Sequence, residues 1–371
     1  MIFESKMDIF EKAVNTGGKI ASKNTTLPVL SSIILSFSKK GCELKATNLD
    51  IGIEIFIPGK CDEEKIVAVP SDIMNSFISK IRKYNGIFTI EVNENNNLVI
   101  KAGKTKSVIK TVPHDDFPTI PTVEDGKKLK NIDPVVFSNG LKSVWYSASQ
   151  STIKPELSSV YMHKVQNDIF FAATDSFRLA EKSIKIEDDS DFPDLLIPAK
   201  NIAHIISILQ TREENIEIKA NKSLLEINTG SIRIASRLVD GVFPDYKQII
   251  PKNVSTEITI LKQDLVDALS VSNVFSDKFN QMKIIIEPND KMIQVDTKNA
   301  DIGENSTKID ADVVGEAISI NFNQRYITDS LQSFDSDSIV LYVSGAQRPM
   351  IIKPVSKNVD FMYLVMPMNR S

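Results

Sequence analysis

The stretch that decides the fold is FFAATDSFRLAE (residues 170–181), in which two apolar runs flank a short polar segment. Aromatic and apolar residues on both sides, with Asp and Ser between them, are typical of two strands joined by a tight turn. The same arrangement occurs in LKATNLDIGIEI (44–55) and in IQVDTKNADIGE (293–304). Thr47, Thr174 and Thr297 mark matching places at nearly equal spacing. We therefore predict one hairpin that is repeated three times along the chain.

Amphipathic helices recur with nearly the same period. Apolar residues at helical spacing predict helices over the windows 7–23, 70–83, 133–149, 198–212, 261–279 and 323–333. Pro70 and Pro198 suit a first helical turn and open corresponding helices of the first and second repeats. Proline-rich junctions follow the first two repeats, at residues 113–128 and 238–253. The sequence thus predicts an α+β protein of three domains, with bounds 1–123, 124–250 and 251–371.

Composition favours a globular protein of the cytoplasm. The chain has 371 residues, of which 42% are hydrophobic and 25% are charged. Its two cysteines, Cys42 and Cys61, form neither a disulfide framework nor a metal-like spacing. The N-terminus carries acidic residues where a signal peptide is apolar, and no run of eighteen apolar residues occurs. We expect a cytoplasmic protein without membrane association.

Groups that could perform catalysis are scarce. The three histidines, His114, His163 and His204, are isolated, and there is no phosphate loop, nucleophile elbow or Cys-x-x-Cys. We expect no catalytic residue, no metal site and no cofactor. Two alternatives stay open: a hydrolase that uses Asp175 as base and Ser176 as nucleophile, and a structural β-rich repeat protein without a role on DNA. The acidic run at 187–194 is read as a solvated loop, with a divalent-ion site as the alternative.

Charge is distributed unevenly between the helices and the rest of the chain. The six helical windows carry a summed charge of +4, while the whole chain carries −4. The helices are therefore the electropositive part of an acidic protein, as a surface facing DNA requires. Basic residues near helix C-termini also complement the helix dipole, which explains their position without DNA.

Five ordered motifs carry a resemblance to a known family: TTLPVLSSIIL (25–35), ATDSFRLA (173–180), SRLVDGVFPDYKQIIPKN (236–253), NFNQRYITDSL (321–331) and YLVMPMNR (363–370). Together with the threefold repeat, they resemble the bacterial DNA polymerase III β subunits, which are replicative sliding clamps, over essentially the whole chain. The resemblance implies three clamp domains per chain, with helices lining the inside and antiparallel sheets outside. It also implies a head-to-tail homodimer that closes into a ring around duplex DNA and acts as a non-catalytic processivity factor.

The resemblance implies two of the surfaces of such a ring. The DNA-facing residues would be Lys23, Asn24, Lys80, Arg82, Lys83, Ser151 and Lys200. The dimer interface would join the first domain of one chain to the third of the other, through Lys104, Lys106, Ile109, Val274, Phe275, Asp301 and Glu304. Opposite charges and an apolar pair suit such a contact. The lysines equally suit a free edge strand that is protected against aggregation.

The third surface is a partner-peptide groove between the second and third domains. The family binds peptides of the type Gln-Leu-x-Leu-Phe, carried by the DNA polymerase III α subunit, the clamp loader and repair polymerases. The matching residues are Lys154, Leu157, Thr174, Ser176, Phe177, Arg178, Leu179, Pro244, Gln248, Ile249, Asn323, Tyr326, Pro349, Val365, Met366, Pro367 and Met368. Methionines suit a groove that serves several partners, although they would also suit a closing core.

This chain departs from the family pattern at a few of these positions. Ser176 and Phe177 stand where Gly-His is common, Gln248 stands at a basic position, and Lys154 and Asn24 stand where arginine is common. We expect the differences at Ser176, Phe177, Gln248 and Lys154 to alter the preference among partner peptides. Asn24 is expected to weaken one DNA contact, for which the adjacent Lys23 could substitute.

Overall fold

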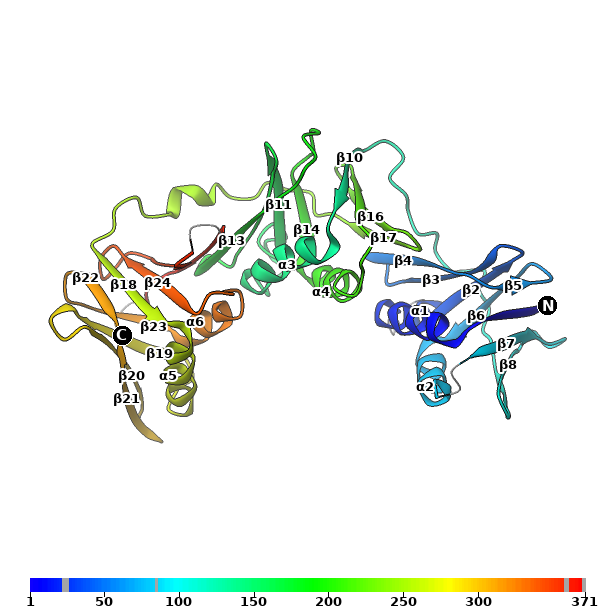
Figure 1. Cartoon of the computed structure of the whole chain (residues 1–371), viewed down its shortest axis with the longest axis horizontal. Coiled ribbons are helices and arrows are strands. Elements are labelled where there is room, and N and C mark those ends of the chain that lie inside the picture. The colour runs from blue at the N-terminus through cyan, green and yellow to red at the C-terminus, as the bar shows by residue number, and fades with distance from the viewer. Residues whose placement is uncertain (22–26, 84–85, 357–359, 369–371) are drawn as a thin grey trace. The chain divides into compact units, whose positions relative to one another are not determined.

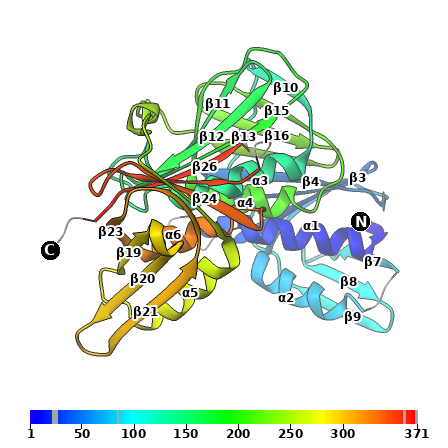
Figure 2. The same cartoon turned by 60° about the vertical axis from the view of Figure 1, so that its left-hand side comes forward.

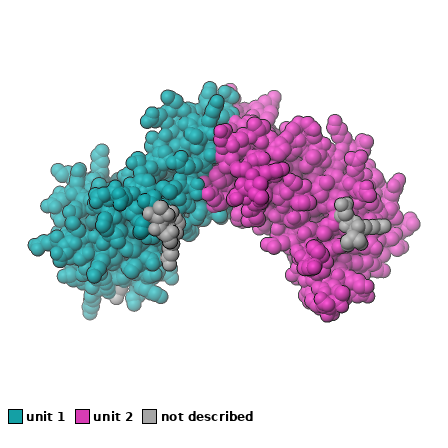
Figure 3. Space-filling model, turned by 180° about the vertical axis from the view of Figure 1, so that it is seen from behind, with its two compact units in different colours: residues 1–135, 190–193, 203–238 teal, residues 136–189, 194–202, 239–371 magenta. Residues whose placement is uncertain are grey.

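The computed structural model describes residues 1–21, 27–83, 86–356 and 360–368. The chain forms two compact units, which Figure 3 shows in different colours. Unit 1 comprises residues 1–135, 190–193 and 203–238, and unit 2 comprises residues 136–189, 194–202 and 239–371. Among the described residues, every strand pairing is antiparallel; some are hairpins of consecutive strands, and others join strands that are distant in the chain.

Unit 1 contains two sheets and the helices α1 (Met7–Ile20) and α2 (Ser71–Ile81), which Figure 1 labels. The five-stranded sheet has the order β5-β1-β7-β8-β9, with β1 (Ile2–Lys6), β5 (Lys60–Cys61), β7 (Ile87–Val92), β8 (Leu98–Ala102) and β9 (Thr105–Ile109). The eight-stranded sheet has the order β10-β15-β16-β17-β4-β3-β2-β6, with β2 (Ser32–Ser38), β3 (Gly41–Thr47), β4 (Ile51–Ile57), β6 (Lys65–Pro70), β10 (Lys127–Ile132), β15 (Ile216–Ala220), β16 (Leu224–Thr229) and β17 (Ile232–Arg237). The short 3-10 helix η1 (Pro28–Ser31) precedes β2.

Two adjacent glycines let α1 pack closely. Helix α1 covers β3 and β4 and lies against α2. A Cβ atom on Gly17 would lie 2.5 Å from the Cδ2 atom of Leu44, and one on Gly18 would collide with the side-chain amide of Asn75 on α2. Glycine therefore costs some helix propensity here, but it permits a close approach to the sheet and to the second helix.

Unit 2 contains a nine-stranded and a four-stranded sheet. The nine-stranded sheet has the order β14-β11-β12-β13-β26-β25-β24-β18-β22, with β11 (Ser159–Val165), β12 (Asp168–Thr174), β13 (Arg178–Lys185), β14 (Leu195–Pro198), β18 (Thr256–Leu261), β22 (Asp312–Gly315), β24 (Ser338–Val343), β25 (Met350–Pro354) and β26 (Phe361–Val365). The four-stranded sheet has the order β21-β20-β19-β23, with β19 (Gln281–Glu287), β20 (Met292–Asn299), β21 (Gly303–Asp310) and β23 (Ile318–Asn323).

The remaining helices are α3 (Pro134–Val144), α4 (Ala199–Leu209), α5 (Lys262–Val274) and α6 (Gln324–Leu331). Helices α3 and α4 have residues in both units, whereas α5 and α6 belong to unit 2. Short 3-10 helices η2 (Trp145–Ser147), η3 (Tyr246–Ile249) and η4 (Pro288–Asp290) lie in the connections. Figure 2 shows α5 alongside β20 and β21, where alternate residues such as Ile293 and Val295 are buried.

The helices and hairpins confirm the predicted repeat. Each of the six helices begins within one residue of its predicted window and ends before that window does. The three predicted hairpins are the pairs β3–β4, β12–β13 and β20–β21. Within the described residues, no helix is long and apolar enough to cross a membrane.

A later strand joins the hairpin of an earlier repeat in two places. In unit 1, β17 pairs with β4, so that Ser236 lies opposite Ile51. In unit 2, β26 pairs with β13, so that Val365 lies opposite Arg178. Both pairings extend a sheet across the boundary between consecutive repeats.

Candidate functional site

The turn between β12 and β13 is held by its own polar side chains. The Thr174 hydroxyl donates to the carbonyl oxygen of Arg178 at 2.6 Å and accepts from the amide of Ser176 at 3.1 Å. The Asp175 Oδ1 atom accepts from the amides of Phe177 and Arg178, each at 3.0 Å. Ser176 has a φ of 77°, a conformation that a non-glycine residue adopts only when its surroundings hold it there. Asp175 and Ser176, which suggested a hydrolase, are therefore engaged in forming the turn.

The corresponding turn of the first repeat has the same hydrogen bonds. The Thr47 hydroxyl donates to the carbonyl oxygen of Ile51 at 2.9 Å, and Asn48 Oδ1 accepts from the amides of Asp50 and Ile51 at 3.0 and 2.9 Å. Leu49, at the position of Ser176, has a φ of 78°. An amide side chain thus replaces the Asp175 carboxylate without altering the turn, because only one side-chain oxygen is needed.

The C-terminal segment lies directly beside this turn. The pairing of β26 with β13 continues beyond the strands, because the Met366 amide donates to the carbonyl oxygen of Phe177 at 2.8 Å. Two residues later, the Met368 amide donates to the carbonyl oxygen of Asn321 at 2.8 Å. Residues 366–368 therefore run from the hairpin of the second repeat to β23 of the third, and their side chains are half-buried.

Arg178 links the turn to helix α6. Its guanidinium lies 2.9 Å from Asp175 and 2.8 Å from Asp329, and its side chain is only 8% exposed. The guanidinium carbon also lies 4.6 Å from the centre of the Tyr326 ring. Burial alone would lower the pKa of Arg178, but the carboxylates of Asp329 and Asp175 raise it above the ordinary value. Arg178 is thus a permanent positive charge that is fully paired in the interior.

Three tyrosines surround this arginine, and only Tyr326 was among the predicted site residues. The Tyr363 hydroxyl donates to the carbonyl oxygen of Tyr326 at 2.6 Å, and its ring lies 6.3 Å from the ring of Tyr146. The Tyr146 oxygen accepts from the hydroxyl of Ser333 at 3.2 Å. Burial raises the pKa of Tyr146 and of Tyr363, so both stay neutral. Sequence reasoning missed Tyr146 because nothing near it in the chain distinguishes it from a core residue. It missed Tyr363, although this residue opens the motif YLVMPMNR, because its contacts are with residues that are distant in the sequence.

The connecting segment 243–250 supplies a second side of the site. Phe243 and Tyr246 are buried in one apolar cluster with Leu179 and Leu364, and Met366 packs against this cluster. The Tyr246 hydroxyl also donates to the carboxylate of Glu181 on β13. This segment displays three of the predicted residues, all exposed: Pro244, Gln248 and Ile249.

Some of the other predicted residues lie beside the elements around Arg178, and others have no hydrogen bond to them. Asn323 caps α6, since its Oδ1 accepts from the Arg325 amide at 3.0 Å, and Pro349 is buried beside the residue that pairs with Val365. Lys154 and Leu157 form a turn of their own, in which the Leu157 amide donates to the Lys154 carbonyl at 3.0 Å. Among the described residues, no hydrogen bond or ion pair of this turn reaches the β12–β13 hairpin.

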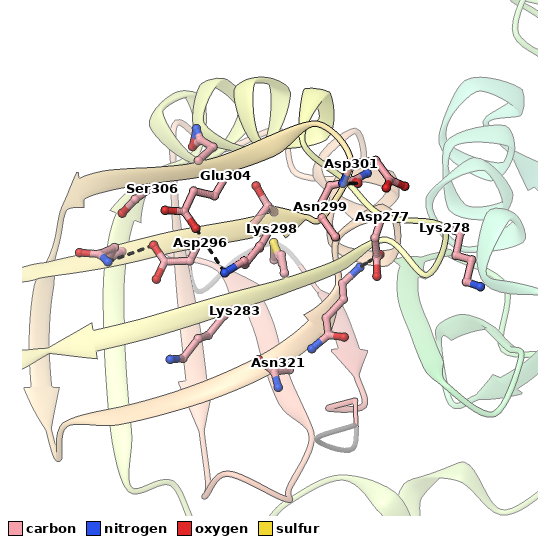
Figure 4. A pocket seen from close by; sticks show the side chains of 16 residues that line it. Asp277, Lys278, Lys283, Asp296, Lys298, Asn299, Asp301, Glu304, Ser306 and Asn321 are labelled. Carbon is pink, nitrogen blue, oxygen red and sulfur yellow. Dashed lines mark hydrogen bonds and ion pairs between the residues drawn. The ribbon is translucent and has the colours of Figure 1, made fainter.

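The residues predicted for a dimer interface lie on two separate surfaces. In unit 1, β9 is an edge strand of the five-stranded sheet; Lys104 precedes it, Lys106 lies within it, and Ile109 is buried at its end. In unit 2, Val274 is 63% exposed at the end of α5, and the Phe275 ring lies against Gly303. Asp301 and Glu304 line a polar cavity of about 1070 Å³ on the four-stranded sheet, where Figure 4 shows Glu304 paired with Lys298.

The predicted DNA-facing residues are distributed over helices and loops. Lys80 and Lys200 are exposed on α2 and α4, Arg82 and Lys83 follow α2, and Ser151 is in an exposed loop. Lys23 and Asn24 lie outside the described residues. In the part of the chain that is described, no cluster of three or more His, Cys, Asp or Glu side chains could hold a metal ion.

Three repeats of two helices and antiparallel sheets, joined strand to strand, define the class of clamp proteins. The N-terminal, central and C-terminal domain models of the DNA polymerase III beta subunit match residues 1–121, 131–245 and 247–369, respectively. The chain therefore belongs to the DNA polymerase III beta subunit family. It is a sliding clamp, a non-catalytic processivity factor of DNA replication.

Individual relatives agree over the whole length. The chain is 27% identical to the "Beta sliding clamp" of Staphylococcus aureus over 361 residues, which is 95% of this chain and 96% of the relative. The Staphylococcus epidermidis protein of the same name has the same identity and coverage. The crystal structures of the DNA polymerase III beta subunit of Thermotoga maritima and of the sliding clamp of Bacillus subtilis match with TM-scores of 0.92 and 0.91. Their sequence identities are 23% and 24%, and each match covers 100% of both chains.

Proposed function

We propose that two copies of this chain associate head to tail into a closed ring around duplex DNA, with domains at residues 1–123, 124–250 and 251–371 in each copy. Closure after two copies avoids the open filaments that head-to-tail contacts otherwise produce. The surface facing the DNA would include Lys80 and Lys200 on the helices, together with Lys23, Asn24, Arg82, Lys83 and Ser151. A topological link needs no tight contact, so a weakly positive inner wall suffices and the DNA can slide. We place this activity in the cytoplasm.

The proposed dimer interface joins β9 of one copy to the end of α5 and the β20–β21 turn of the other. An edge strand offers unpaired backbone groups, and its lysines complement Asp301 and Glu304. The exposed Val274 and its neighbour Phe275 would form the apolar centre of the contact.

Light scattering at micromolar concentration tests this interface. A variant carrying Lys104→Glu and Lys106→Glu should dissociate into monomers, because the contact would then bring acidic residues together. The matched control carries Lys39→Glu and Lys40→Glu, two exposed lysines in the turn between β2 and β3, and should stay dimeric. If the variant with Lys104→Glu and Lys106→Glu stays dimeric, this assignment of the interface is excluded.

We further propose that the turn of the second repeat, the 243–250 segment and the C-terminal residues form a groove for short peptides. The occupants are motifs of the type Gln-Leu-x-Leu-Phe, in the polymerase III α subunit, the clamp loader and repair polymerases. The observation that carries this proposal is the alignment of residues 365–368 against Phe177 and Asn321, which brings backbone and adaptable Met side chains to one surface.

The activity itself is tested by primer extension on circular single-stranded DNA with a DNA polymerase III and its clamp loader. Adding the chain should convert short products into full-length products in one binding event, and linearising the template should abolish the effect because a ring slides off a free end. Equal stimulation on linear and circular templates would contradict a topological link.

A further inference from the structure

At both junctions within the chain, the last strand of one repeat pairs with the hairpin of the repeat before it. Strand β17 of the second repeat joins β4 of the first, and β26 of the third repeat joins β13 of the second. The last strand of the first repeat is β9, and the corresponding hairpin strand of the third repeat is β21. Within the described residues, each of these two strands ends its sheet, so one row of its backbone groups lies outside the ladder.

The ladders of the third repeat fix the position of Asn305 on β21. Counted across the sheet from the strand that leads into the second helix of each repeat, Asn305 occupies the same place as Ile53 on β4 and Ala180 on β13. Asn305 also faces the helix side of its sheet, because the opposite residue, Thr297, donates its hydroxyl to the Ser272 carbonyl of α5 at 3.3 Å.

The ladders of the first repeat fix the position of Ser107 on β9 in the same way. Counted from the strand that leads into the first helix, and allowing for the bulge at residues 129–132, Ser107 occupies the place of Ile234 on β17 and Tyr363 on β26. Ile234 and Tyr363 are the residues that lie opposite the counterparts of Asn305 at the two junctions. If β9 and β21 form a third junction of this kind, Ser107 therefore lies opposite Asn305.

The side chains that face inward would differ sharply at this third junction. At the two junctions within the chain, the central pairs are 0% exposed and apolar or aromatic: Ile53 with Ile234, and Ala180 with Tyr363. On β9 and β21, the inward side chains at the central pair and the next one are polar and half-buried: Ser107 with Asn305, and Thr105 with Thr307. The Thr307 hydroxyl already donates to Asn305 Oδ1 at 2.9 Å, so a small polar network is present on β21.

We propose that β9 of one copy pairs with β21 of a second copy in this register, and that the polar inner face makes this junction the place where the ring opens. This inference rests on the proposed dimer. Separating two isoleucines exposes apolar surface to water, which costs free energy in proportion to the area. Separating hydroxyl and amide groups costs less, because water replaces their hydrogen bonds. The junction between copies is thus held by backbone pairing and opens without exposing an apolar inner face.

Disulfide cross-linking tests the register. Residues opposite each other on antiparallel strands have Cα atoms about 4.5–5.5 Å apart, which suits a disulfide. The variant carries Ser107→Cys and Asn305→Cys together with Cys61→Ser, since the other native cysteine, Cys42, is buried. Mild oxidation should give covalent dimers on a denaturing gel.

A displaced cysteine pair is the matched control for the register. Ser107→Cys with Thr307→Cys shifts one partner by two residues along the same face, and should link less than about a tenth as fast because the Cα atoms are then too far apart. Preferential linking of the Thr307→Cys variant would overturn the register.

Subunit exchange between rings that carry two different fluorescent labels tests the opening. Ser107→Val with Asn305→Leu gives the junction an apolar inner face, so exchange should slow at least about tenfold. The control is Ser306→Val, an exposed residue on the outward face of β21, which should leave exchange unchanged. Unaltered exchange in the Ser107→Val, Asn305→Leu variant would overturn the role of the polar face.

Light scattering of the cysteine variants separates failure of this junction from failure of the dimer. If the chain is dimeric but neither cysteine pair links, the pairing of β9 with β21 is wrong and the proposed dimer stands on another surface. If the chain is monomeric at micromolar concentration, both the junction and the proposed dimer are wrong.

Discussion

Met366 donates its amide hydrogen to the carbonyl oxygen of Phe177 at 2.8 Å, and Arg237 donates in the same way to Asp50 at 2.9 Å. Both acceptors are the third residue of a turn that begins with Asn48 or Asp175. The same hydrogen bond therefore occurs at the end of both strand pairings that join consecutive repeats. The two junctions differ in the side chain of the donor residue, which is methionine at the second junction and arginine at the first. The Arg237 guanidinium turns back to donate to the Leu49 carbonyl at 2.9 Å, whereas Met366 packs on an apolar cluster.

Removal of residues 366–371 should abolish binding of a Gln-Leu-x-Leu-Phe peptide, because the backbone that borders the groove would end at Val365. Strand β26 ends at Val365, so the sheet should remain and the chain should still form dimers. Fluorescence polarisation measures the first property and light scattering the second. Unchanged peptide affinity in the truncated chain would exclude these residues from the groove.

Replacing Asp175 by Asn and by Ala should have unequal effects. Asp175→Asn keeps the oxygen that accepts from Phe177 and Arg178, as Asn48 does in the first repeat, and loses only the ion pair. Asp175→Ala leaves the amides of Phe177 and Arg178 without this acceptor, so it should lower the unfolding free energy by about 1–3 kcal/mol. This loss should be larger than that of the Asp175→Asn variant. Denaturant unfolding monitored by circular dichroism measures the unfolding free energy of both variants. Equal losses in the two would show that the hydrogen bonds of this turn contribute little to stability.

Removing the Arg178 side chain should destabilise unit 2. Arg178→Ala would leave the partly buried carboxylates of Asp175 and Asp329 unpaired, at a cost of about 2–4 kcal/mol. Arg178→Lys should recover little of this, since one ammonium cannot bond both carboxylates in the same geometry. The control is Arg348→Ala, an exposed arginine near Pro349, which should change stability by less than about 0.5 kcal/mol. Thermal unfolding measures the stability of the Arg178→Ala, Arg178→Lys and Arg348→Ala variants. Full stability of the lysine variant would show that pairing one guanidinium with both Asp175 and Asp329 is not required.

Glu54 should make stability in unit 1 sensitive to acid. Burial would raise the pKa of Glu54, but its bonds to Arg233 at 2.8 Å and Lys45 at 3.0 Å lower it below the ordinary value of 4.5. A carboxyl whose pKa is depressed on folding contributes stability above its unfolded pKa, and this is lost as the pH falls through the folded pKa. Stability should therefore decline below about pH 4.5. Glu54→Gln should flatten that decline in urea titrations at several pH values, whereas Glu43→Gln, whose carboxylate is exposed, should flatten it less.

The repeats could be predicted from sequence because helix and hairpin signals are local. Pro70 and Pro198 mark helix starts, and the run of polar residues after Thr47 and Thr174 marks a turn whose bonds all join near neighbours in the chain. The pairing of β13 with β26 has no such signal, since nothing in residues 361–365 indicates which of the available edges they will join.

The candidate site was predicted through resemblance more than through physics. Ordered motifs placed Arg178, Tyr326 and Met366 in one site, and the structure brings these three residues around the same turn. Tyr146 and Tyr363 escaped because their roles depend on burial and on neighbours that are distant in the sequence.

Strand pairing between repeats also determines when each sheet can be completed during synthesis of the chain. Ile51 pairs with Ser236, which the ribosome adds only when the second repeat is almost complete. At about 5–20 residues per second, β4 waits roughly 10–40 s for this neighbour. The edge of β13, made before β17, waits about as long for Val365, which comes at the end of the third repeat. From the synthesis of β4 onward, a nascent chain of this protein therefore carries at least one unpaired sheet edge until the last strand leaves the ribosome.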